Sequence, residues 1–137
     1  MSLKYFISIF LLVLSFSTYA KTPKHIIENV YFLAEAAAIL NVCFESQEYK
    51  KLSAEKANEI HDLAFSLTST VEKIAKHYND DNLYRYFEIT RVQISSDQQV
   101  IDHVKSKYNY CNESLSGDME AYFSEIEKTI NQLLTRQ

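Results

Sequence analysis

The chain contains almost no residues that interrupt regular secondary structure. It has one glycine, Gly117, and one proline, Pro23, among 137 residues. Tight turns between strands commonly require glycine and related residues, so this scarcity argues against a β-sandwich. It also leaves no glycine-rich phosphate loop and no Gly-x-Ser-x-Gly turn. We therefore predict a helical protein that is not an enzyme.

Motifs that bind metals or cofactors are missing from the sequence as well. None of the four widely spaced histidines stands in a His-Glu-x-x-His pattern; they are His25, His61, His77 and His103. Neither Cys-x-x-Cys nor a haem-attachment motif occurs. Met119 and His103 are the pair that could hold a non-covalent haem, but nothing in the sequence makes them face each other. We expect no metal site and no cofactor.

The amino-terminal residues have the three parts of a cleavable signal peptide. Lys4 provides a positive charge, residues 5–14 are almost entirely apolar, and a more polar stretch ends at Ala20. An uncleaved membrane anchor is the alternative, but a spanning helix needs about 20 apolar residues and this run is roughly half as long. We predict that residues 1–20 are removed, which leaves residues 21–137 as a single helical domain. We expect no later segment to be long and apolar enough to cross a membrane.

The destination of the exported chain is predicted from the same features. A short signal with no cysteine beside it for lipidation, in a chain rich in Lys, Ile and Asn, favours a bacterial periplasm. The glycosylation sequon at residues 112–114 keeps secretion from a eukaryotic cell open. All 18 acidic residues but only 13 of the 14 Lys and Arg lie in residues 21–137, which gives that part a formal charge of −5. This charge argues against binding to nucleic acid or to anionic lipid.

Apolar side chains recur at the three- and four-residue steps of amphipathic helices. The clearest stripe is Ala57, Ile60, Ala64, Leu67, Val71, Ile74 and Tyr78. A helix before it is predicted from Ile26, Val30, Leu33, Ala37, Leu40 and Phe44, and a last helix from Met119, Tyr122, Phe123, Ile126, Ile130 and Leu133. We expect Thr22, Ser53 and Ser116 to cap these helices, with Pro23 in the first turn of one and Leu115 as a hydrophobic staple before another.

The region from residue 83 to residue 110 allows two interpretations. Its apolar residues continue at heptad spacing through Ile94 to Tyr108, which favours one long helix. However, Asp97 would then lie on the apolar stripe, and Ser96-Asp97-Gln98-Gln99 reads as a capping box that begins a new helix. We favour the single helix. The fold class is therefore all-α, an up-down four-helix bundle, with a five-helix array as the alternative.

The chain has two cysteines, and their positions suit a disulfide. Cys43 lies near the end of the first predicted helix and Cys111 just after the third. In an up-down bundle these helices run the same way, so both cysteines reach the same end. A redox-active or metal-binding pair is the alternative, but the required spacing is absent. We predict a structural disulfide in an exported protein.

The most suggestive candidate for a binding surface is a cluster of aromatic and basic residues. Residues 84–87 read Tyr-Arg-Tyr-Phe, and Arg91 follows four residues after Phe87. Tyr and Arg are over-represented in interaction hot spots, so we predict partner binding through Tyr84, Arg85 and Arg91. The plainer interpretation is that the rings cover the flank of the bundle. A homodimer through this surface is a further arrangement that the pattern allows.

The sequence as a whole favours an exported, soluble, helical module that binds another protein in the cell envelope. An inhibitor or immunity protein and an adaptor or chaperone of an envelope complex are specific versions of this hypothesis, based on analogy at the level of class. The alternative is a bundle that holds a small ligand or cofactor in its core. Nothing in the sequence identifies the partner.

Overall fold

The computed structural model describes residues 21–108, 111 and 116–136, and this part of the chain is helical without strands. Its elements are α2 (Lys24–Glu45), the 3-10 turn η1 (Tyr49–Lys51), α3 (Ala54–His77), α4 (Asp81–Ser95), α5 (Gln98–Tyr108) and α6 (Ser116–Thr135). The predicted all-α class is confirmed. The signal peptide predicted at residues 1–20 lies outside the described residues.

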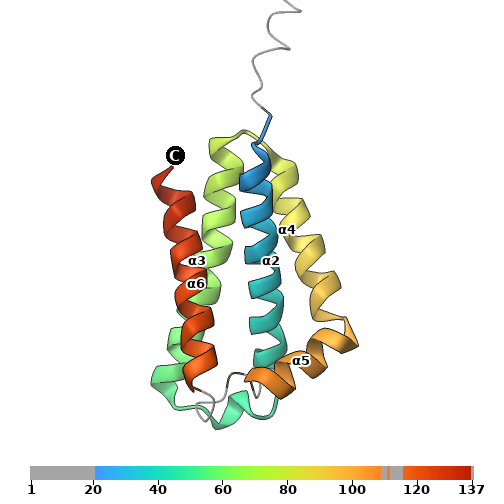
Figure 1. The fold of residues 1–137 in the computed structure, drawn as a ribbon, viewed down its shortest axis with the longest axis vertical. Coiled ribbons are helices and arrows are strands. Elements are labelled where there is room, and N and C mark those ends of the chain that lie inside the picture. The colour runs from blue at the N-terminus through green and yellow to red at the C-terminus, as the bar shows by residue number, and fades with distance from the viewer. Residues whose placement is uncertain (1–20, 109–110, 112–115, 137) are drawn as a thin grey trace, which may run out of the picture.

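The helices form an up-down bundle in which α2 is the central element (Figure 1). α2 and α4 run in one direction and α3 and α6 in the other, while α5 lies across one end. α2 contacts all of the other helices and packs most closely against α4. From Leu33 to Cys43 its side chains are buried on every side, apart from the half-buried Glu35 and Asn41. This burial explains why α2 needs small residues such as Ala36 and Ala38 where neighbouring backbones approach.

The preferred prediction of one continuous helix over residues 83–110 is wrong. α4 ends at Ser95, and α5 begins at Gln98 after a turn. The carboxylate of Asp97 accepts a hydrogen bond from the backbone N–H of Gln99 at 2.8 Å, which caps α5 and keeps a charged group out of the core. Five helices are therefore present in the described part of the chain. The turn sends α5 over the end of the bundle, where Val104 and Tyr108 are buried.

The other predicted caps had mixed outcomes. Ser53 accepts a hydrogen bond from the backbone N–H of Lys56 at 3.2 Å, as expected of an N-cap. Thr22 does not cap α2, because that helix begins at Lys24 with Pro23 as its N-cap. The Thr22 hydroxyl instead donates to the Asp80 carboxylate at 2.7 Å and ties the start of α2 to the α3–α4 turn. α6 begins at residue 116 itself; the side chain of that residue and its predicted staple lie outside what the structure describes.

The disulfide is present and joins Cys43 to Cys111. The sulfur atoms are 2.01 Å apart, the Cα atoms are 5.7 Å apart, and both residues are fully buried. The bond fastens the end of α2 to the segment that follows α5, at the end of the bundle that α5 crosses (Figure 1). Both cysteines reach this end for the predicted reason, since α2 and α4 are parallel. A disulfide is in keeping with an oxidising compartment.

The expectation that no segment after residue 20 is long and apolar enough to cross a membrane is wrong for α2. By length and composition alone, this helix is long and apolar enough to cross a membrane. However, 61% of its apolar window is buried inside the bundle, where the other helices cover it. A central core helix must be apolar on every side, and it therefore resembles a membrane span in composition. The same burial accounts for the apolar character of α2 without a membrane.

Candidate functional site

The structure separates Arg85 from Tyr84 and Arg91, the other two residues that the sequence suggested for partner binding. Tyr84 is half-buried on the flank of α4, with its ring centroid 6.1 Å from that of Phe87. Burial, then the charges of Glu88 and of Glu72 on α3, raise the pKa of Tyr84. Arg91 lies on the same flank and donates to the Glu88 carboxylate at 2.8 and 3.4 Å. Tyr84 therefore contributes to packing and Arg91 to a local ion pair, and of the three residues only Arg85 is exposed.

The outward face of α4 carries a ridge of apolar side chains that the sequence interpretation missed. Tyr86, Ile89 and Val92 follow one another at three-residue steps, so they lie along one side of the helix. Their exposed fractions are 38%, 51% and 51%. Arg85 lies on this face as well. We call Arg85, Tyr86, Ile89 and Val92 the α4 ridge.

The α4 ridge stands out because three exposed apolar side chains follow one another there, although Asp81 begins the same face of the helix. The exposed residues of α4 and its C-cap are Asp81, Asn82, Arg85, Tyr86, Ile89, Val92, Gln93 and Ser96. Glu88 is only half exposed and is paired with Arg91. The whole chain has 18 acidic residues and a net charge of −4, so three neighbouring exposed apolar side chains beside an arginine depart from its general character. The signal was available in the sequence, since removing the core stripe of Leu83 and Phe87 leaves a second apolar stripe on α4.

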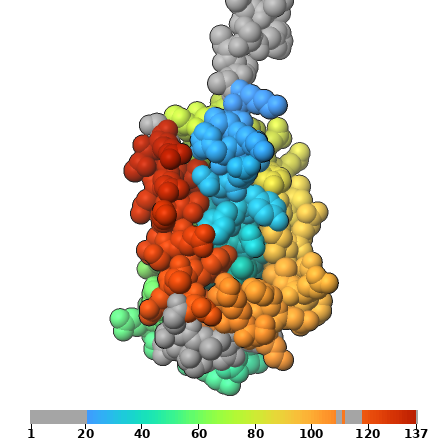
Figure 2. Space-filling view, in the orientation of Figure 1, coloured from blue at the N-terminus to red at the C-terminus, as the bar shows by residue number. Residues whose placement is uncertain are grey.

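A hollow of about 430 Å³ lies where α2, α5 and α6 meet, next to the turn between α4 and α5. Figure 2 shows this face hollowed between α6, α2 and α5, in red, cyan and orange. We call it the acidic hollow, because three carboxylate residues from different helices or turns line it: Glu35, Asp97 and Glu125. Ile39 and Ile94 provide apolar surface, and His103 and Lys107 complete the rim on α5.

Aromatic rings form one wall of the acidic hollow. Tyr108 of α5 stacks on Tyr122 of α6, with ring centroids 5.4 Å apart and planes inclined by 26°. The Tyr122 hydroxyl is buried and has no hydrogen-bond partner in the described structure. Burial, followed by the negative charges of Glu35 and the neighbouring groups, raises the pKa of Tyr122 well above its ordinary value. Tyr122 is therefore a neutral phenol beside carboxylates, with an unmet need for a hydrogen bond.

Replacing Tyr122 with Phe tests this description. A buried hydroxyl without a partner costs about 1–3 kcal/mol, so Tyr122→Phe is expected to raise the free energy of unfolding at pH 7 by about 1 kcal/mol. Above pH 10 the gap should widen by up to about 1.4 kcal/mol per pH unit, because the unfolded chain loses the Tyr122 proton while the folded chain keeps it. Urea unfolding between pH 7 and 11 measures both effects.

The matched control for this substitution is Tyr31→Phe, at a ring that is 45% exposed. It should leave the free energy of unfolding at pH 7 within about 0.5 kcal/mol of the original value. A loss of stability in Tyr122→Phe at pH 7 would contradict the assignment, because it would show that the hydroxyl makes a stabilising bond in the folded protein.

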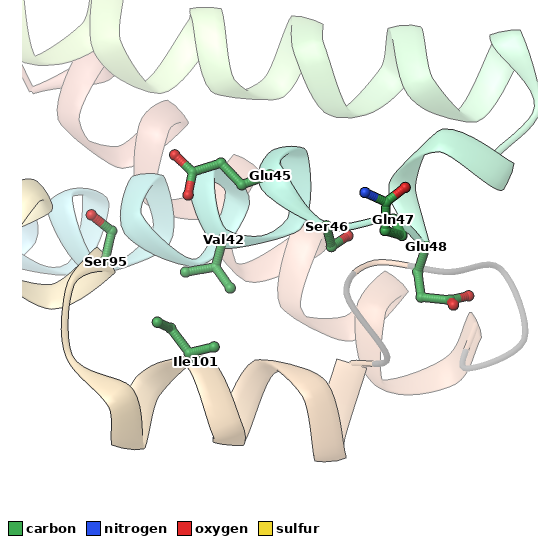
Figure 3. A pocket seen from close by; sticks show the side chains of 7 residues that line it. All are labelled: Val42, Glu45, Ser46, Gln47, Glu48, Ser95 and Ile101. Carbon is green, nitrogen blue, oxygen red and sulfur yellow. The ribbon is translucent and has the colours of Figure 1, made fainter.

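A second hollow lies on the other side of the α4–α5 turn, beside the end of α2 (Figure 3). It has a volume of about 340 Å³, and Val42 of α2 and Ile101 of α5 point toward each other across it. Glu45 and Ser95 lie at its rim. Its other lining residues are polar, and none of its titratable groups is buried, so we assign it no chemical role.

Within the described residues, no group of three or more His, Cys, Asp or Glu side chains is placed to hold a metal ion. His61 stacks on Phe44 with ring centroids 4.7 Å apart, and His77 packs edge-on against Tyr78. His103 and Met119 lie on α5 and α6. Comparison with protein-family models, curated proteins and solved structures found no match to this chain.

Proposed function

We propose that this chain is an exported protein-binding module that docks another protein of the periplasm or the extracellular space on the α4 ridge. The single observation that carries the proposal is the run of exposed apolar side chains Tyr86, Ile89 and Val92 beside Arg85 on an acidic chain. Exposed apolar residues grouped in this way, with aromatic and arginine side chains among them, are typical of interaction sites. The proposal includes no catalytic role.

The side chains of the α4 ridge indicate which kind of surface the partner must have. Tyr86, Ile89 and Val92 need an apolar groove into which one side of a helix fits, as in helix-in-groove recognition. Arg85 forms no ion pair within the described structure, so a carboxylate at the border of that groove would complete its charge. An inhibitor, an immunity protein and an adaptor would all use such a surface, and the identity of the partner decides among them.

Capture of the partner from an envelope extract tests this proposal when it is made with variants of the ridge. The original protein, with its disulfide intact, is expected to retain one partner in a 1:1 ratio. The double variant Ile89→Asp/Val92→Asp should retain at least tenfold less, because it places two charges where the partner offers apolar surface. Quantitative mass spectrometry measures the recovered amounts.

The control for capture is Asn131→Asp/Gln132→Asp, which adds the same charge to exposed positions of α6. This variant should retain the partner as well as the original protein does. Equal recovery with the α4 variant would overturn the proposal. A homodimer in light scattering that the α4 variant dissociates would overturn it as well, since the ridge would then bind a second copy of this chain.

A further inference from the structure

The exposed apolar side chains of this protein gather around α4. Within the described residues, the large apolar side chains that are exposed are Tyr31, Phe65, Tyr86, Ile89 and Val92. Three of them belong to the α4 ridge, and the other two lie on α2 and α3, the two helices against which α4 packs most closely. A single exposed apolar residue is normal on a protein surface, whereas neighbouring ones indicate an interaction site.

A hydrogen bond at one end of the bundle fixes the height of Tyr31 relative to the ridge. The Thr22 hydroxyl donates to the Asp80 carboxylate at 2.7 Å, so α2 and α4 begin side by side and run in the same direction (Figure 1). Tyr31 comes nine residues after Thr22, and Ile89 comes nine residues after Asp80. At a rise of about 1.5 Å per residue, both lie about 14 Å from this end of the bundle.

Tyr31 borders the ridge from the side of α2. It precedes Val42 by eleven residues, or about three helical turns, so both residues lie on one side of α2. Val42 lines the hollow of about 340 Å³ together with Ser95, the last residue of α4 (Figure 3). The side of α2 that carries Tyr31 is therefore the side next to α4.

Phe65 borders the ridge from the side of α3. It comes twelve residues before the last residue of α3, and Val92 comes eleven residues after the first residue of α4, so both lie about 17 Å from the turn that joins these helices. Phe65 also precedes Glu72 by seven residues, or about two helical turns, which places both on one side of α3. That side faces α4, because the negative charge of Glu72 acts on Tyr84 there.

The exposed apolar residues thus form a band across three adjacent helices, with α4 in the middle. We give the name apolar belt to Tyr31, Phe65, Tyr86, Ile89 and Val92. The two rings at its ends lie at the height of the ridge, one on each side of it.

The α4 ridge by itself is small for a stable interface. A large apolar side chain offers on the order of 200 Å² when fully exposed, so the three apolar residues of the ridge offer roughly 250 Å² at their exposed fractions. A standard interface buries about 800 Å² on each partner, of which somewhat more than half is apolar. Tyr31 at 45% and Phe65 at 76% exposure bring the apolar area of the belt to roughly 500 Å², which is close to that requirement.

We propose that the partner encloses the outward side of α4 in an apolar groove whose two walls contact Tyr31 on α2 and Phe65 on α3. This inference rests on the proposed function and adds the shape of the partner. The partner is a protein with a groove about as wide as a helix, roughly 10 Å, with aliphatic or aromatic walls and a carboxylate that meets Arg85. A second copy of this chain does not fit, because the belt is convex around α4 and two identical convex surfaces would leave both rings exposed.

Photo-crosslinking from single positions tests this shape. The photoreactive residue p-benzoylphenylalanine replaces Tyr31, Phe65 or Ile89 in the full exported chain, and the exposed Gln132 on α6 is the control position. After illumination in an envelope extract, the three belt positions should crosslink to the same protein, and position 132 should yield at least tenfold less of that product. Peptide mapping should place the crosslinks from Tyr31 and Phe65 in two different, mainly apolar segments of the partner.

The pattern of crosslinks separates this inference from the proposed function. Crosslinks from Ile89 without crosslinks from both rings, or crosslinks from the rings to different proteins, would contradict the belt and leave docking on the ridge intact. No crosslink from Ile89 would overturn the proposed function and the belt with it. A product with twice the mass of this chain would also exclude both, because the partner would then be a second copy.

Alanine variants measure how much the two rings contribute to binding. Tyr31→Ala/Phe65→Ala should lower retention of the crosslinked protein at least about tenfold, because large aromatic side chains dominate the energy of many interfaces. The control Asn58→Ala/Gln132→Ala truncates two exposed side chains outside the belt and should change retention less than about twofold. Full retention by the aromatic double variant, together with loss in Ile89→Asp/Val92→Asp, would overturn the belt alone. Circular dichroism checks that the variants remain folded, as expected for changes at exposed positions.

Discussion

Removing the disulfide is expected to lower the free energy of unfolding by about 4 kcal/mol. The bond closes a loop of 68 residues, and in the chain-entropy model such a loop strongly restricts the unfolded chain. Residual structure in the unfolded state reduces the effect, so this value is an upper figure. Because small domains are stable by about 5–15 kcal/mol, the reduced protein should be close to its limit of stability.

Two measurements check the role of the disulfide independently. Urea unfolding of the original protein with and without a phosphine reductant measures the bond itself. Unfolding of Cys43→Ala/Cys111→Ala measures its replacement, and the reductant should not affect this variant. A loss below about 1 kcal/mol in both measurements would show that α5 and the following segment hold their places without the bond.

The substitution Phe87→Ala is expected to cost about 3–5 kcal/mol of the free energy of unfolding, which is the range for truncating a large buried aromatic side chain. Phe87 is fully buried in the core, on the side of α4 opposite the ridge. α4 packs against both α2 and α3, so the cavity would open between three helices that rely on one another. Urea unfolding followed by circular dichroism measures the loss.

Phe65→Ala is the matched control for Phe87→Ala, since it makes the same chemical change in a helix at a ring that is 76% exposed. It should change the free energy of unfolding by less than about 0.5 kcal/mol. If Phe87→Ala does not fold, Phe87→Leu keeps most of the volume and should cost less than about 1.5 kcal/mol. Similar losses for the alanine variants at Phe65 and Phe87 would contradict the assignment of α4 to the core by this face.

The two expected losses bear on the proposed function as well as on stability. The disulfide fixes the end of the bundle where α5 borders the acidic hollow, and Phe87 fixes the rotation of α4 that turns Ile89 outward. Variants of the ridge change exposed positions instead. Their unfolding free energies should therefore stay near the original value, which separates lost binding from lost folding.

The sequence predicted the helices where the apolar period and the local caps agree. Residues 57–78 form such a stretch, and Ser53 caps the helix there as expected. The disulfide was also predictable, because parallel first and third helices are enough to bring both cysteines to the same end of the bundle. At Asp97 the apolar period and the local cap gave different predictions. The heptad spacing of apolar residues predicted a continuous helix, whereas the capping box predicted that a new helix begins there. The preference for continuity failed because an α5 turned across the bundle buries Val104 and Tyr108 without burying the carboxylate.

The candidate sites depended on tertiary structure to a greater degree. A hot-spot argument singled out Tyr84, Arg85 and Arg91 by residue type, but a helix sends neighbouring residues to different faces. Tyr84 packs against the core cluster, and Arg91 forms an ion pair with Glu88. The exposed apolar residues beside Arg85 are instead Ile89 and Val92. No sequence pattern joins Glu35, Tyr108 and Glu125, because they come from different helices and meet only in the folded chain.

The sequence alone therefore determined the all-α class, the main helical stripes and the cysteine pairing, since these follow from local periodicity and the direction of consecutive helices. The tertiary structure decided where the third helix breaks, which face of α4 meets solvent, and which carboxylates share one hollow. These features depend on how much surface each packing arrangement buries and which charges it must keep in water. That balance involves all helices at once, and no single segment of the sequence contains it.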